Sequence, residues 1–95
     1  MFAELLIQLG DALDRHGLPY MVIGGQAVLV HGEPRLTRDI DITVGVGVDG
    51  IDRVLALVAE LGLQPLPDDP RVFAVETMVV PALDKASGIR VDLIL

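Results

Sequence analysis

The chain contains no cysteine and no tryptophan, and aromatic residues make up only 3% of its 95 residues. Without cysteine it has no disulfide framework, no thiol nucleophile and no zinc-thiolate site. The scarcity of aromatic side chains argues against the stacking platforms on which single-stranded nucleic acids bind. No stretch approaches the roughly 20 apolar residues of a membrane span, and the N-terminus lacks the basic region and apolar run of a signal peptide. We therefore expect a cytoplasmic protein with no membrane partner.

Basic residues are also scarce: the sequence has 7 Lys and Arg and 14 Asp and Glu, which gives a net charge of -7. This balance argues against a broad nucleic-acid footprint, which needs a basic face. It does not argue against a nucleoside triphosphate, since bound metal ions reverse the local sign of the charge. Hydrophobic residues reach 52%, so residues 1–95 can form a single small domain with its own core.

The spacing of apolar residues predicts an α/β (α+β) fold with a mixed sheet of about four strands and helices packed on one face. Helices are predicted over 2–16, 26–30 and 51–61, and strands over 20–23, 39–44, 77–83 and 89–95. The last two strands should form an antiparallel hairpin through the turn residues 85–88. Residues 33–38 and 64–70 read as loops, and 72–75 as a possible helical turn.

Single residues refine these boundaries. Gly17 and Gly62 are placed to end the first and last helices, and Asp49 can cap the helix over 51–61. Pro81 lacks a backbone N–H, which favours a place for its strand at a sheet edge.

The final predicted strand ends with the apolar residues Leu93-Ile94-Leu95. An uncovered apolar strand invites association, so we expect either a further C-terminal helical portion or a partner there.

Three aspartates carry the functional signal. Asp39 and Asp41 lie two residues apart on a predicted strand and therefore point to the same side, while Ile40 points into the core. Asp92 joins them if the strand over 89–95 pairs beside the strand over 39–44. Neighbouring carboxylates repel one another, and a hard cation such as magnesium relieves that repulsion while leaving room for phosphate oxygens.

The segment Ile23-Gly24-Gly25-Gln26-Ala27-Val28, followed by Arg35-Leu36-Thr37-Arg38-Asp39-Ile40-Asp41 and later by Val91-Asp92-Leu93, resembles the nucleotidyltransferase superfamily of the DNA-polymerase-β type. The sequence of these motifs is most similar to the bacterial branch that includes AbiEii-type toxins and minimal nucleotidyltransferases. The resemblance runs from Tyr20 to Leu95. That superfamily usually has a C-terminal helical region, for which this sequence has no counterpart.

The resemblance implies a magnesium-dependent transfer of a nucleoside monophosphate from a nucleoside triphosphate to a hydroxyl acceptor, with release of pyrophosphate. Asp39, Asp41 and Asp92 would bind two magnesium ions, with manganese as a substitute, and act in catalysis. The pair Gly24-Gly25 would let the backbone approach a phosphate. The predicted helix from Gln26 would aim its N–H groups at that phosphate, and Arg38 could contact it. The acceptor, whether protein, RNA or small molecule, is not specified.

Each feature also has a purely structural interpretation. The two glycines could form only a tight turn, Asp39 and Asp41 a solvated strand face, and Asp92 an ion pair with Arg90. The chain as a whole could be a regulatory module without turnover, one half of a toxin–antitoxin pair, that binds a helical partner or a second copy through its C-terminal strand. It could also be part of a longer aminoglycoside-type or RNA-directed transferase.

Overall fold

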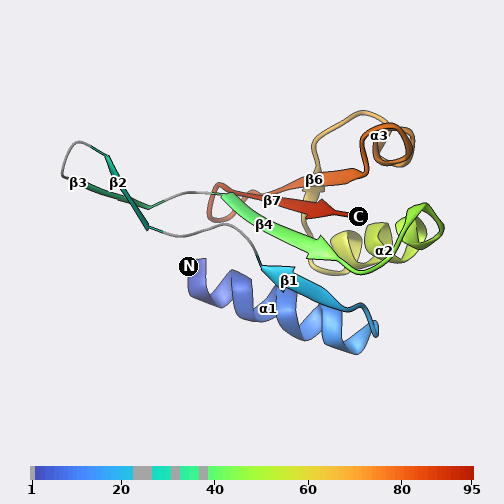
Figure 1. Cartoon of the computed structure of the whole chain (residues 1–95), viewed down its shortest axis with the longest axis horizontal. Coiled ribbons are helices and arrows are strands. Elements are labelled where there is room, and N and C mark those ends of the chain that lie inside the picture. Colours follow the sequence, from blue (N-terminus) through green and yellow to red (C-terminus); the bar gives the residue numbers. More distant parts are fainter. Residues whose placement is uncertain (1, 23–26, 31–32, 37–38) are drawn as a thin grey trace.

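The computed structural model describes residues 2–22, 27–30, 33–36 and 39–95, and the side chains of residues 3–22 and 39–95 (Figure 1). In this part of the chain the elements are α1 (Phe2–Arg15), β1 (Tyr20–Val22), β2 (Ala27–Val30), β3 (Glu33–Leu36), β4 (Asp39–Val44), a 3-10 turn (Val48–Gly50), α2 (Ile51–Glu60), β5 (Gln64–Pro65), α3 (Pro70–Thr77), β6 (Val79–Asp84) and β7 (Ile89–Ile94). The fold is α+β. Within the described part of the chain, we find no helix with both the length and the apolar character that a membrane span requires.

The main sheet has five strands in the order β1-β4-β7-β6-β5. Strands β4 and β7 run parallel, and the remaining neighbours are antiparallel. The predicted mixed sheet is therefore present, but it has five strands, because Gln64–Pro65 adds the short edge strand β5 within a segment expected to be a loop. The hairpin of β6 and β7 is confirmed.

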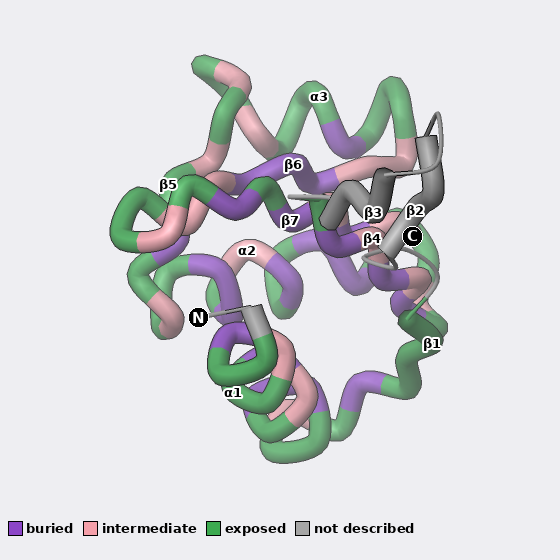
Figure 2. Tube along the Cα trace, turned by 90° about the vertical axis from the view of Figure 1, so that its left-hand side faces the viewer, coloured by how far each residue is buried: buried purple, intermediate pink, exposed green. Residues whose placement is uncertain are grey.

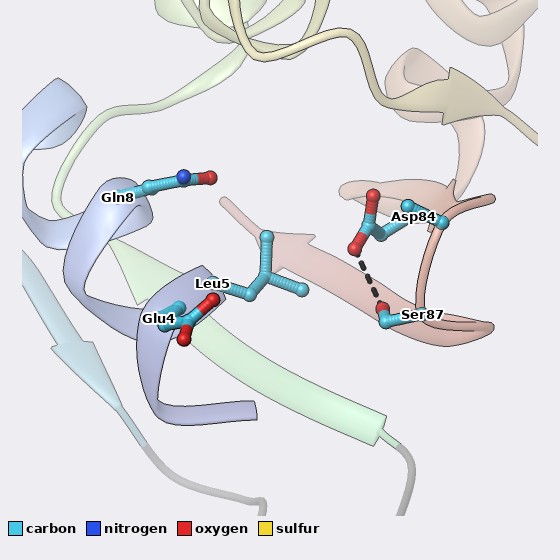
Figure 3. A pocket seen from close by; sticks show the side chains of 6 residues that line it. Glu4, Leu5, Gln8, Asp84 and Ser87 are labelled. Atoms are coloured by element: carbon cyan, nitrogen blue, oxygen red, sulfur yellow. Dashed lines mark hydrogen bonds between the residues drawn. The ribbon is translucent and has the colours of Figure 1, made fainter. Parts of the chain in front are cut away.

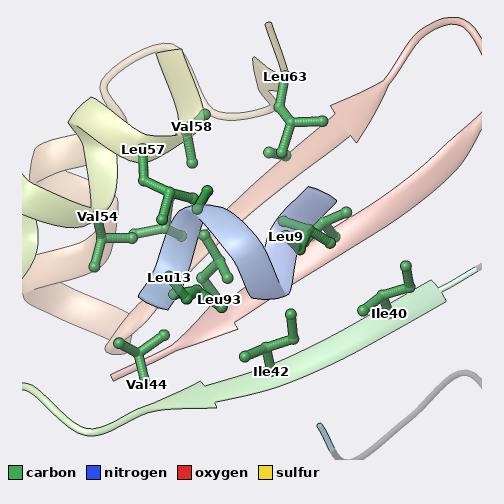
Figure 4. Close-up of a cluster of buried hydrophobic side chains, with 14 of the residues drawn as sticks. Leu9, Leu13, Ile40, Ile42, Val44, Val54, Leu57, Val58, Leu63 and Leu93 are labelled. Atoms are coloured by element: carbon green, nitrogen blue, oxygen red, sulfur yellow. The ribbon is translucent and has the colours of Figure 1, made fainter. Parts of the chain in front are cut away.

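Helices α1 and α2 cover the same face of this sheet (Figure 2). Their inward residues and those of the central strands form one apolar cluster (Figure 4). Complete burial of a Leu, Ile or Val side chain contributes about 1.5–3 kcal/mol relative to exposure, so this layer provides much of the stability. Side chains of this cluster that are at most 2% exposed include Leu9, Leu13, Ile40, Ile42, Val44, Val54, Leu57, Val58, Val91 and Leu93.

Helix α1 follows its predicted pattern, with Leu5, Leu9 and Leu13 buried at helical spacing. The chain leaves the helix at Gly17, whose φ of 66° suits glycine better than any other residue. Gly10 has a packing role as well, since a Cβ there would lie 2.9 Å from the hydroxyl oxygen of Tyr20. The glycine in mid-helix thus allows strand β1 to lie close against α1.

The start of α2 differs from the prediction. Its N-cap residue is Gly50, and no side chain makes a capping hydrogen bond there, so the expected cap by Asp49 was wrong. The 3-10 turn Val48–Gly50 runs directly into the helix, and Gly50 donates a backbone hydrogen bond to the carbonyl of Gly47. Asp49 lies within that turn, one position too early for the cap. The predicted end at Gly62 agrees with its φ of 69°.

Two predictions between β1 and β4 were wrong. Residues 27–30 form strand β2 instead of a helix, and residues 33–36 form strand β3 instead of a loop. The two strands pair as an antiparallel hairpin that extends away from the main sheet (Figure 1). A helix of one turn is marginal because its nucleation is costly, whereas the β-branched residues Val28 and Val30 favour an extended chain.

The C-terminal strand β7 lies inside the sheet between β4 and β6. Leu93 is fully buried, and the N–H of Leu95 donates to the carbonyl of Met78 at 2.8 Å. The expectation of an uncovered apolar strand is therefore wrong, because neighbours on both sides satisfy its backbone. This removes the observation on which association through that strand depended.

Pro81 lies within the inner strand β6, where its missing backbone N–H does not disturb the pairing with β7. Its carbonyl accepts the N–H of Leu66 on the β5 side at 3.0 Å, and the N–H and C=O of one strand residue point to the same side. The missing N–H of Pro81 therefore faces β5, whose ladder covers only Ala82 and Leu83. The expectation of an edge strand was wrong for β6 as a whole, but its physical reason holds locally.

Candidate functional site

The parallel pairing of β4 and β7 brings the sequence-predicted acids together on the sheet face opposite the α1–α2 layer. In this register Asp41 is the partner of Asp92, and Asp39 is the partner of Arg90. Neighbouring strands are ~4.8 Å apart, so Asp41 and Asp92 are direct cross-strand neighbours. Asp39 is exposed, while Asp41 and Asp92 are half-buried. We call Asp39, Asp41, Asp92 and Arg90 the acidic site.

Strand geometry explains why the acids face outwards. Along β4 the burial alternates, with Ile40, Ile42 and Val44 in the core and Asp39, Asp41 and Thr43 on the other face. Along β7, Val91 and Leu93 are fully buried. A shift of one residue in either strand would drive carboxylates into the apolar layer. The core residues therefore fix the register that places Asp41 beside Asp92.

The surroundings of Asp41 raise its pKa above the ordinary value of 3.8. The largest cause is desolvation by partial burial, followed by the negative charges of Asp92 and Asp39 and a side-chain hydrogen bond with Asp92. The positive charge of Arg90 has the smallest effect and acts in the opposite direction. The acidic site is thus a place where negative charge is crowded, and a cation there would be favoured.

Arg90 completes this site, and the ion pair between Arg90 and Asp92, which was the structural interpretation of Asp92, is confirmed. Its Nε donates to Oδ1 of Asp92 at 2.9 Å, and the two side chains are 49% and 20% exposed. The hydrogen bond and the charge of Asp92 raise the pKa of the guanidinium, and the charges of Asp39 and Asp41 add to this. The Arg-x-Asp spacing on a strand allows this pair, because residues two apart share a face.

Magnesium suits the chemistry of these donors. They are carboxylate oxygens from adjacent strands, which hard cations prefer. Partial burial, and after it the charges of Asp92 and Asp39, raise the pKa of Asp41. Among the described residues, no group of three His, Cys, Asp or Glu side chains stands out as a metal site. Asp39, Asp41 and Asp92 are the residues that would hold the ion.

The predicted phosphate-binding residues Gly24, Gly25, Gln26 and Arg38 lie outside the described residues. The helix that was expected to start at Gln26 is not formed over Ala27–Val30, which is strand β2. A helix N-terminus aimed at a phosphate from this segment was therefore a wrong expectation.

A pocket of about 200 Å³ lies elsewhere, between α1 and the turn that joins β6 to β7 (Figure 3). It is lined by Glu4, Leu5, Gln8, Asp84, Ala86 and Ser87. The Oγ of Ser87 donates to Oδ2 of Asp84 at 2.6 Å, which stabilises the turn. No member of the acidic site lines this pocket, so the chemistry proposed for the aspartates does not depend on it.

Comparison with models of protein families and with curated proteins finds no match to this chain.

Proposed function

We propose that the chain is a metal-dependent nucleotidyltransferase that transfers a nucleoside monophosphate from a nucleoside triphosphate to a hydroxyl acceptor. The single observation that supports this is the parallel register of β4 and β7, which makes Asp41 the partner of Asp92 with Asp39 on the same face. Acids from separate segments of the chain thus meet on a sheet face that the α1–α2 layer leaves uncovered. Alternation on one strand alone would not achieve this.

The register suggests the residues that would hold the metal. Asp41 and Asp92 are adjacent across the strands, and with Asp39 on the same face they would hold the magnesium ions. Bound magnesium would supply charge stabilisation at the phosphoryl oxygens. Asp92 would accept the proton of the acceptor hydroxyl at a carboxylate oxygen. Gly24, Gly25 and Arg38 are proposed to contact the phosphates, as the motif resemblance implies.

Binding tests this proposal without knowledge of the acceptor. Calorimetric titration of magnesium with each of four non-hydrolysable nucleoside triphosphates should show saturable heat for the wild type. We expect Asp41→Asn and Asp92→Asn to weaken binding at least tenfold, because each removes a charged ligand. Asp68→Asn is the matched control, since it removes one exposed loop carboxylate outside the acidic site and should bind as the wild type does.

Transfer is then measured with labelled nucleoside triphosphates and protein, RNA and small-molecule acceptors. Transfer that Asp41→Asn abolishes and Asp68→Asn preserves supports the proposal. Equal binding by all three variants and the wild type would contradict it, and so would the absence of any nucleotide binding. In the latter case a regulatory module without turnover becomes the better interpretation.

A further inference from the structure

Arg90 occupies a distinctive position in the acidic site. It lies on β7 beside Asp39 in the register and two residues before Asp92, so its side chain and all three carboxylates share one sheet face. Its Nε is hydrogen-bonded to Oδ1 of Asp92 at 2.9 Å. One oxygen of the proposed metal-binding set is therefore already engaged by a cation that belongs to the chain itself.

We propose that Arg90 is an internal competitor of the divalent ion: its guanidinium neutralises the aspartates, and it must give up Asp92 for the ion to bind. The proposal rests on the proposed function, because it assigns the metal to these aspartates. Arg90 is a positioning residue here. It acts through Asp92 and sets the metal concentration at which the site fills.

Charge decides between competition and support. A hydrogen-bonding neighbour can orient a ligating carboxylate and improve metal binding. A guanidinium also carries a full positive charge that does not titrate in the physiological range, and it would remain a few Å from a divalent cation. Repulsion at that separation is about 1 kcal/mol or more even in water. The loss of the Asp92 contact adds to it, so competition outweighs orientation.

The position of Asp92 agrees with this, because one of its carboxylate oxygens already contacts the guanidinium of Arg90. Since the ion pair is 49% exposed on the Arg90 side, solvent weakens it. A divalent ion can therefore displace the guanidinium without disturbing the buried layer, which lies on the other face.

The test compares metal binding by the wild type, Arg90→Gln and Arg90→Lys, with Arg71→Gln as the control. Arg71 is also a surface arginine in one ion pair, with Asp52, and its replacement changes the net charge equally. Manganese alone is titrated, and its position is followed by the broadening of backbone amide signals in NMR spectra. Affinity comes from calorimetry. The readouts need neither nucleotide nor acceptor.

We expect Arg90→Gln to bind manganese roughly three- to tenfold more tightly than the wild type, the range that removal of one nearby positive charge allows after screening by salt. Arg90→Lys keeps the charge and should stay within about twofold of the wild type. Arg71→Gln should do the same. Broadening should centre on Asp41 and Asp92 in every variant.

The outcomes separate the two proposals. Unchanged or weaker binding by Arg90→Gln, with the signals of Asp41 and Asp92 still broadened, overturns the competition and leaves the metal site intact. Broadening centred elsewhere, or no binding by any variant, overturns the proposed metal site and the competition with it. Thermal unfolding without metal is a further check, since Arg90→Gln removes a positive charge beside three carboxylates and should be less stable than Arg71→Gln. Equal stability would also count against the proposal.

Discussion

The crowding of carboxylates at Asp41 predicts that Asp41→Asn stabilises the fold at neutral pH. In the folded chain Asp41 is partly desolvated and faces the charges of Asp92 and Asp39, which raise its pKa. Asparagine has the same shape and no charge, so it removes both penalties. A substitution that impairs the proposed activity should therefore increase stability, as expected for a residue kept for function.

The magnitude follows from the strand spacing. Two unit charges ~4.8 Å apart repel by about 1 kcal/mol in water, and partial burial increases this value. Arg90 offsets part of the repulsion, and solvent screens the half-exposed face. We therefore expect a net stabilisation of about 1 kcal/mol, which corresponds to about 4–8 °C in Tm for a domain of this size.

The sign of the pH dependence follows from the direction of the pKa shift. Asp41 binds its proton more tightly in the folded state, so its contribution is favourable below the ordinary pKa of 3.8 and is lost as pH rises through the raised value. Thermal unfolding followed by circular dichroism, without divalent ions, measures the difference between Asp41→Asn and wild type. That difference should be largest at pH 7 and should vanish below pH 3.8.

Asp68→Asn provides the control for net charge, because it also removes one carboxylate from an acidic chain but lies exposed in a loop. Its Tm should differ from the wild type by much less than that of Asp41→Asn. Equal stability of the two variants at pH 7 would contradict this prediction. So would a stabilisation by Asp41→Asn that does not shrink on acidification.

Three further substitutions test the packing and the helix ends by chemical denaturation. Gly50→Ala should destabilise by about 1–3 kcal/mol through overpacking, since its Cβ would lie 2.7 Å from Cβ and Cγ2 of Val46; an unchanged midpoint would contradict the close packing. Asp69→Ala should cost about 1 kcal/mol because Asp69 Oδ1 accepts the N–H of Val72 and caps α3, and Asp69→Asn should restore most of it. Leu57→Ala should cost about 2–5 kcal/mol, because Leu57 is fully buried in α2; a loss below 1 kcal/mol would refute its place in the core.

The regular elements could be predicted where a strong pattern agreed with clear end signals. Apolar spacing identified α1 and α2, and Gly17 and Gly62 supplied their ends through positive φ. Alternation identified β4. These features are local, so neighbouring residues are enough to specify them. The helix prediction for residues 27–30 failed for the opposite reason. A four-residue apolar run fits the periodicity of a helix and of a strand, and pairing with β3 decides that it forms a strand.

The site divides along the same line. The sequence alone determined that Asp39 and Asp41 lie on one side of their strand, and that Arg90 and Asp92 lie on one side of theirs. The reason is that backbone geometry fixes the side-chain period of a strand. Only the tertiary structure decided that these two faces are one, through the parallel register of β4 and β7. That register is set by burial of the intervening Ile and Val residues against α1 and α2, a long-range packing requirement that no local pattern contains.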